Sequence, residues 1–190
     1  MTVKKSVLLA SAVVGTLFIS PGVALAELPL GERTVYLKAE SGERRAVASL
    51  TFEQAGPDEV SYSLSVVDDA FGDYFLSMRP FQCLESSEKH WCYVPYPYEN
   101  NRKISADDLT DLEYDLLFIW KGATEYGINM WNGVYYDLEL ADGGLNGVLS
   151  EINMDVLSVP PEAGNLRPIR SADIHSADPD SHWLPYVVIE

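Results

Sequence analysis

The sequence predicts an all-β fold: about eight antiparallel strands forming an up-and-down β-barrel or a barrel-like sandwich, with one short helix and an irregular C-terminal arm. Three observations predict it. Apolar and polar residues alternate with a period of two in many segments. Short turns such as Gly56-Pro57-Asp58 separate these segments. The long apolar helix that a parallel α/β fold needs between its strands is missing.

The first three expected strands cover residues 34–39, 46–52 and 60–66 and are joined by short turns. The third strand is the clearest, because four apolar residues alternate with three serines, which is typical of a strand buried on one face. Its apolar residues are Val60, Tyr62, Leu64 and Val66.

The middle of the chain predicts three further strands at residues 74–81, 90–94 and 113–121. The last of these is apolar on both faces, which indicates a central strand. Between the second and the third, the alternating prolines of residues 93–98 favour an extended segment rather than a central strand.

One short helix is also expected before residue 113. Ser105 followed by Asp108 resembles a helix N-cap, and Leu109 and Leu112 would form the buried face. The acids Asp107, Asp108, Asp111, Glu113 and Asp115 are interpreted as helix-start acids on a solvated face, since no glycine supports a calcium loop.

A hairpin is predicted at residues 134–140 and 145–154, joined by Ala141-Asp142-Gly143-Gly144. Val134, Tyr136, Leu138 and Leu140 should share the buried face, while Asp137 and Glu139 face water. Residues 160–190 are interpreted as an irregular arm, with a short helix around residues 171–175 and a closing strand at 186–189.

The expected architecture is similar to that of the small lipid- and biotin-binding barrels, the lipocalin and streptavidin type. No motif of those families occurs in the sequence. A shared architecture is a weak warrant for function, so no family is assigned on this ground.

Residues 1–26 predict an export signal. Two lysines precede an apolar run at residues 6–19, and the small residues Ala24 and Ala26 favour cleavage before Glu27. The alternative is a membrane anchor, but these 14 apolar residues are fewer than the roughly 20 that span a bilayer. We therefore expect an exported protein, periplasmic or secreted, without a stable membrane span.

Residues 27–190 fit a single domain. Removing the two lysines of the signal changes the net charge from −16 to −18. Such a charge excludes nucleic acid as a partner, because nucleic-acid binding requires a basic surface. Basic proteins remain possible partners.

Cys83 and Cys92 are the two cysteines, and in an oxidising compartment they predict a disulfide. The alternative is a catalytic thiol at Cys92, two residues after His90 and on the same face of a strand.

The sequence contains no catalytic, phosphate-binding or cofactor-binding motif, and we expect no catalytic residue or cofactor. A cluster in the C-terminal arm is the closest approach to a metal site, because imidazoles and carboxylates are ligands of zinc and similar ions. Its members are Asp173, His175, Asp178, Asp180 and His182. The alternative interpretation is a solvated polar loop.

Aromatic residues crowd two stretches, around residues 91–98 and 120–136. They are candidates for a ligand-binding site, although they also suit a barrel core. The candidate ligand-binding residues are Trp91, Tyr93, Tyr96, Trp120 and Tyr136.

The leading functional hypothesis is a non-enzymatic binding protein of the cell envelope, with a small apolar or amphipathic ligand inside the barrel. This hypothesis requires a barrel with a hollow interior. An interior filled by Phe118, Trp120 and Tyr136 would count against it. The alternatives are an acidic interaction module or inhibitor of a basic secreted protein, and a metal-dependent hydrolase. The oligomeric state is open.

Overall fold

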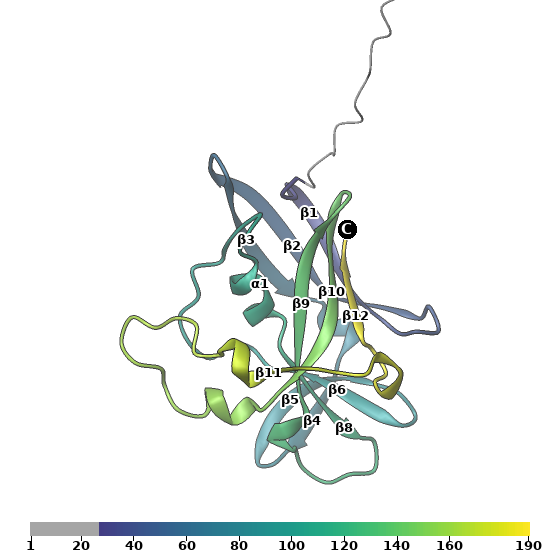
Figure 1. The fold of residues 1–190 in the computed structure, drawn as a ribbon. Coiled ribbons are helices and arrows are strands. Elements are labelled where there is room, and N and C mark those ends of the chain that lie inside the picture. The colour runs from purple at the N-terminus through teal and green to yellow at the C-terminus, as the bar shows by residue number, and fades with distance from the viewer. Residues whose placement is uncertain (1–26) are drawn as a thin grey trace, which may run out of the picture.

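The structure, a computed structural model, describes residues 27–190 and is mainly β with one short α-helix, which confirms the predicted class (Figure 1). The predicted export signal lies outside the described residues. Among the described residues, no helix is long and apolar enough to span a membrane.

Twelve strands make up one sheet. Their bounds are β1 Gly31–Lys38, β2 Arg44–Gly56, β3 Glu59–Val66, β4 Gly72–Leu76, β5 Arg79–Glu85, β6 Lys89–Tyr93, β7 Lys103–Ser105, β8 Phe118–Gly122, β9 Gly133–Ala141, β10 Gly144–Ile152, β11 Ile174–Ser176 and β12 Tyr186–Ile189. Helix α1 covers Thr110–Asp115. The 3₁₀ turns are η1 Asp68–Ala70, η2 Met130–Asn132, η3 Met154–Leu157, η4 Ser171–Asp173 and η5 Pro179–Ser181.

The sheet is open rather than a clear barrel, and its strand order is β4-β5-β6-β8-β9-β10-β12-β1-β2-β3-β7, with β11 paired to β10. The prediction of about eight strands in an up-and-down barrel is therefore too simple. After β6 the chain crosses to the far edge of the sheet, where β7 pairs with β3, and then returns through α1 to β8. Two meanders result, joined by β12.

Two predicted strands have different bounds in the structure. The segment 74–81 is a hairpin, because Ser77 and Met78 adopt φ of 49° and 65° and reverse the chain between β4 and β5. The segment 113–121 begins as helix, since Tyr114 lies in α1. Ser105 is not the N-cap of α1 but the last residue of β7, and Leu109 occupies the cap position without a side-chain hydrogen bond.

The hairpin of β9 and β10 is confirmed in register, but β10 ends at Ile152, two residues before the predicted end at residue 154. Leu138 pairs with Gly147, and Gly144 pairs with Ala141 across the predicted turn. Asp137 and Glu139 are exposed as expected. Leu138 and Leu140 are half-buried rather than buried, and they pack against the same core as Val134 and Tyr136.

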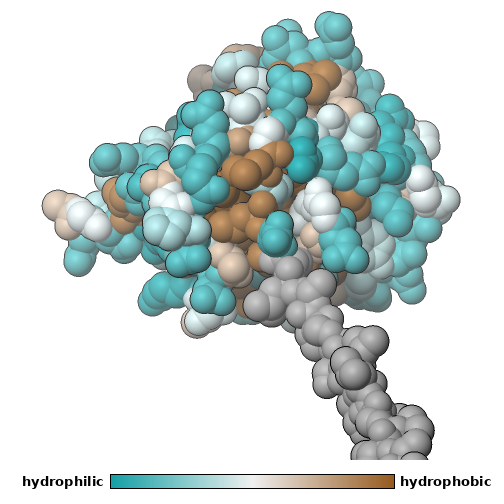
Figure 2. Space-filling view, turned by 90° about the horizontal axis from the view of Figure 1, so that it is seen from above, coloured by the Kyte–Doolittle hydropathy of each residue, from teal (hydrophilic) through white to brown (hydrophobic). Residues whose placement is uncertain are grey.

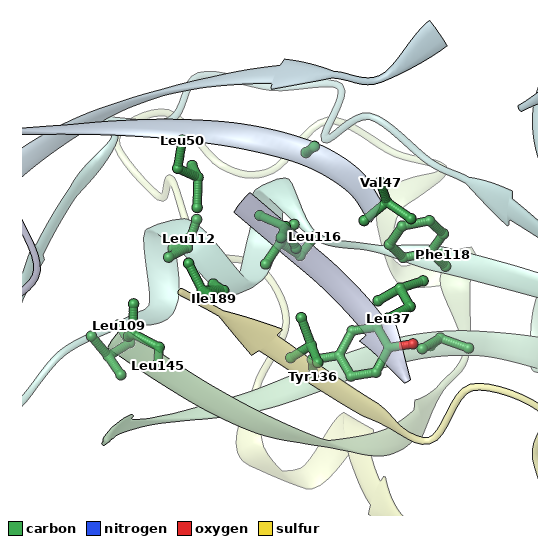
Figure 3. Packing of buried hydrophobic residues seen from close by; sticks show 14 of the residues in the cluster. Leu37, Val47, Leu50, Leu109, Leu112, Leu116, Phe118, Tyr136, Leu145 and Ile189 are labelled. Atoms are coloured by element: carbon green, nitrogen blue, oxygen red, sulfur yellow. The ribbon is translucent and has the colours of Figure 1, made fainter. Parts of the chain in front are cut away.

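One hydrophobic core lies on the concave side of the sheet. Figure 3 shows side chains from α1, β1, β2, β8, β9, β10 and β12 pointing toward one another. Leu109 and Leu112 lie in this core, as the sequence predicted for the buried face of the helix. Phe118 and Tyr136 are 1% and 0% exposed, so large aromatic rings occupy the interior.

A second core lies on the opposite face of β5, β6, β8 and β9. It contains the disulfide Cys83–Cys92, which joins directly paired residues of β5 and β6, as the sequence predicted. Leu157 and Ile169, from the irregular segment after β10, pack over it. The sheet is thus covered on both faces, and the outer cover borders the main groove of the molecule.

The C-terminal arm is largely irregular up to residue 185, apart from the short strand β11 and two 3₁₀ turns, one of them at Ser171–Asp173 where a short helix was expected. Its last strand, β12, lies between β1 and β10 in the middle of the sheet.

Candidate functional site

A groove begins where the ladder between β5 and β6 ends. The last pair of this ladder is Gln82 with Tyr93. The next residue, Val94, donates its N–H to Leu117 O at 3.0 Å and so turns away from β5. Pro95 cannot donate to a ladder, nor can Pro97 two residues later. The proline-rich segment therefore diverges from β5 and leaves a gap beside it.

On the other side of this gap stands Pro80 of β5, which also lacks an N–H and suits an unpaired edge. The resulting groove has a volume of about 950 Å³. Its lining is mainly apolar and comes chiefly from β5, residues 94–98, β8, the loop after β8 and turn η3. The main apolar residues are Phe81, Val94, Ile119, Ile128, Met130, Met154 and Leu157.

A few polar groups stand among these apolar residues. Asp73, Arg79, Gln82 and Ser158 line the groove. Among residues 27–190, Arg79 forms no ion pair. The groove thus offers a long apolar surface with one cation and one anion, which suits binding and orientation of a ligand.

The two tyrosines of the groove, Tyr93 and Tyr98, are hydrogen-bonded. Tyr98 donates its hydroxyl to Leu157 O at 2.7 Å and thereby fixes the wall to η3. Tyr93 donates to Asp115 O at 3.1 Å. Burial, with the nearby Asp115 carboxylate, raises the pKa of Tyr93 to about 12, so this hydroxyl stays protonated near neutral pH.

Exposed apolar side chains stand beside the groove. Phe75 and Met78, at the tip of the β4–β5 hairpin, are 74% and 86% exposed, and Trp131 next to the lining residue Met130 is 69% exposed. Ser77 Oγ accepts the Ile128 N–H at 3.0 Å, which ties the hairpin to the loop after β8. Large exposed apolar side chains that gather in this way mark interaction sites.

Of the five candidate ligand-binding aromatics, Tyr93 borders the groove, although its ring packs against Phe118 of the concave core with ring centroids 5.5 Å apart. Trp91 and Tyr136 lie in the concave core, where the Trp91 Nε1–H donates to Tyr136 Oη at 3.2 Å. Tyr96 packs edge-on against Tyr114 with ring centroids 4.8 Å apart.

Trp120, the remaining aromatic candidate, is half-buried, with its ring centroid 6.0 Å from that of His182 and Lys89 Nζ 4.7 Å from its ring. The interior that the ligand was expected to occupy is therefore occupied by aromatic side chains. The groove lies on the opposite face of the sheet.

No family model, no curated protein and no solved structure matches this chain.

The residues of the predicted metal cluster are not brought together. Within residues 27–190, no group of three or more His, Cys, Asp or Glu side chains could hold a metal ion. His175 is exposed on β11, while His182 is buried between two tryptophans. The side chain of Asp178 caps turn η5 by accepting the Asp180 N–H at 3.1 Å.

Ser181, His182 and Glu151 stand in the order of a hydrolytic triad. Ser181 Oγ lies 2.8 Å from His182 Nδ1, and His182 Nε2 lies 3.0 Å from Glu151 Oε1. However, the Ser181 hydroxyl donates to Asp178 O at 2.7 Å, and the N–H groups of Ser181 and His182 bond within the turn. No nearby turn N–H is left to stabilise an oxyanion, so the arrangement favours a structural role.

The acids of residues 107–115 are also structural, but they are not all solvated as expected. Asp111 and Asp115 are 3% and 5% exposed. Arg167 Nη2 lies 2.6 Å from Asp111 Oδ1, and Arg102 Nε lies 3.2 Å from Asp115 Oδ2. These ion pairs attach the irregular segment and the β7 region to α1.

Sequence reasoning missed most of the groove lining, including Ile128, Met130, Met154 and Leu157. Their apolar character is ordinary, and they come from separate loops and turns. The prolines at positions 80, 95 and 97 could have indicated the groove, because they mark where the hydrogen bonding between two strands must end.

Proposed function

We propose that this chain is an exported, non-enzymatic binding protein that holds a small apolar or amphipathic ligand in the groove between β5 and residues 94–98. The observation that carries the proposal is the groove, with a volume of about 950 Å³ and a mainly apolar lining. Ligand pockets of proteins typically measure roughly 300–1,000 Å³ and combine apolar walls with a few polar groups.

The chemistry of the lining supports an amphipathic ligand. Phe81, Ile119 and Met154 offer apolar contact, and Arg79, which forms no ion pair in the described part of the chain, also lines the groove. Methionines adapt their shape to irregular ligands. An acyl or aromatic body would lie on the apolar residues, with a polar head near Arg79.

Titration with the amphipathic fluorophore 1-anilinonaphthalene-8-sulfonate tests the proposal. We expect saturable binding at one site and loss of that binding in Val94→Trp, because the indole would fill the groove beside Pro95. The matched control is Val148→Trp, since Val148 is 47% exposed on β10 and does not line the groove.

We expect the affinity for the fluorophore to fall at least about tenfold in Val94→Trp. In Val148→Trp the affinity should stay within about twofold of that of the parent protein. Equal affinities in the two variants, or an unsaturable fluorescence increase, would refute a groove-bound ligand.

Export is part of the same proposal, and the disulfide agrees with an oxidising compartment. We expect exported material to begin at Glu27. N-terminal sequencing of the secreted or periplasmic fraction checks this, and a chain that keeps Met1 would contradict it.

A further inference from the structure

Strand β9 has an edge that no other strand covers among the described residues. On that side β8 pairs with β9 only at Val134 and Gly133. From Tyr135 onward, β9 is hydrogen-bonded to a strand only on its β10 side. An uncovered edge presents N–H and C=O groups that can pair with another chain.

Glu113 of α1 already occupies part of this edge. Its Oε1 accepts the Leu138 N–H at 2.8 Å, where the carbonyl of an added strand would otherwise stand. Because backbone groups alternate in direction along a strand, the N–H and C=O of Leu140 point to the same side as those of Leu138. Both Leu140 groups therefore face outward from the sheet.

A slot of about 320 Å³ lies directly against this edge. Residues 106–110 form one wall and Leu138, Glu139 and Leu140 form the other. The slot lies toward the end of the molecule that carries the β9–β10 turn, and Figure 2, which looks onto that end, shows hydrophobic residues exposed among hydrophilic ones. Apolar side chains of an added strand could pack beside the half-buried Leu138 and Leu140.

The charged residues of the slot are all acidic. They are Asp107, Asp108, Glu113 and Glu139. Asp108 is paired with Arg167 at 2.7 Å and Glu113 accepts the Leu138 N–H, whereas Asp107 and Glu139 are exposed and form no ion pair within residues 27–190. The overall charge has the same sign, with 29 acids against 13 bases in the chain.

We propose that the free edge of β9 binds an extended basic segment of a partner protein as an added strand. Main-chain hydrogen bonds to Leu138 C=O and to Leu140 supply affinity, as in other cases of strand addition. Lysine or arginine side chains of the segment pair with Asp107 and Glu139, and its alternate apolar side chains face Leu138 and Leu140. This site is separate from the groove beside β5 and does not depend on it.

Calorimetry with three synthetic peptides separates backbone pairing from charge attraction. The first alternates lysine and valine, the second alternates glutamate and valine, and the third is the lysine peptide with every valine replaced by proline. We expect the lysine–valine peptide to bind and the other two to bind at least about tenfold more weakly. Replacing valine with proline keeps the charge of the peptide, but a proline residue has no backbone N–H to donate to the edge of β9.

Variants of the protein test the same edge. Asp107→Asn with Glu139→Gln should weaken the lysine–valine peptide by about tenfold and reduce its dependence on salt. The matched control is Asp68→Asn with Asp69→Asn, which removes the same charge from exposed positions outside the slot and should leave binding within about twofold. Hydrogen exchange at the Leu140 amide should slow when the peptide binds.

No binding of the lysine–valine peptide overturns the proposal. Equal binding of the proline peptide overturns strand addition, and equal loss in the two double variants overturns the slot as the site. Because the peptide series uses the unmodified protein, a variant that fails to fold leaves the test intact.

Discussion

His90 is 9% exposed on β6, and its Nδ1 has no hydrogen-bond partner among the described residues. It pairs across the sheet with Lys121, which is 3% exposed, and with Glu85 on the other side, while the Tyr74 ring lies 4.6 Å away. Burial and then the Lys121 charge lower the pKa of His90, and Glu85 opposes them. The folded protein therefore holds a proton on His90 less readily than the unfolded chain does.

A lowered pKa in the folded state predicts a specific pH dependence. The unfolded chain takes up a proton at His90 at a pH near 6.5, before the folded protein does, so this site costs stability as pH falls from about 7.5 toward 5. We expect His90→Leu to flatten the loss of stability in that range. Urea melts at both pH values measure it, with the exposed His175→Leu as control. Parallel curves for the parent and His90→Leu would contradict the argument.

At the scale of single residues, the disulfide could be predicted from the sequence because two cysteines allow only one pairing. It could not assign the aromatics to a site. Trp91 and Tyr93 are two residues apart and share one face of β6, yet Trp91 is fully buried while Tyr93 also reaches the groove at the end of the ladder. That difference depends on where β5 stops pairing with β6. The alternation of apolar and polar residues in the sequence does not show where this pairing ends.

Among the elements, the β9–β10 hairpin was predictable because its turn and its alternation are local. The break within residues 74–81 was not, because Ser77 and Met78 take positive φ without a glycine or asparagine to signal it. Strands β7 and β11 have three residues each, too few for a visible period.

The register of β9 makes a direct prediction about stability. Leu138 packs against the concave core, whereas Glu139 is exposed. Leu138→Asp places a carboxylate against apolar side chains and near Glu113, so we expect a loss of about 2 kcal/mol or more. Glu139→Lys should change the free energy of unfolding by about 0.5 kcal/mol or less. Urea melts of the two variants provide the comparison, and equal losses would mean that the register is wrong.

At the scale of the whole molecule, strand order was beyond local patterns. The crossing of β7 to β3 and the insertion of β12 between β1 and β10 are contacts between distant parts of the chain. Two glycines of β10 make room for β12, because a Cβ at Gly144 would lie 1.9 Å from Ile189 O and one at Gly147 would lie 2.6 Å from Val187 Cγ1. The arm's last residues thus complete the sheet.

This topology predicts that β12 is essential for folding, because among residues 27–190 it alone joins the meander of β1–β3 to that of β4–β10 in the sheet. A chain that stops after Pro185 should lose the cooperative thermal transition and its near-ultraviolet circular dichroism.

Point variants within β12 refine the test. Val187 is 0% exposed and Val188 faces the other side of the sheet, half-buried. Val187→Asp should cost about 3 kcal/mol or more, and Val188→Asp about 1 kcal/mol or less. If the shortened chain keeps a sharp transition, or if the two aspartates cost the same, then β12 does not hold the meanders together.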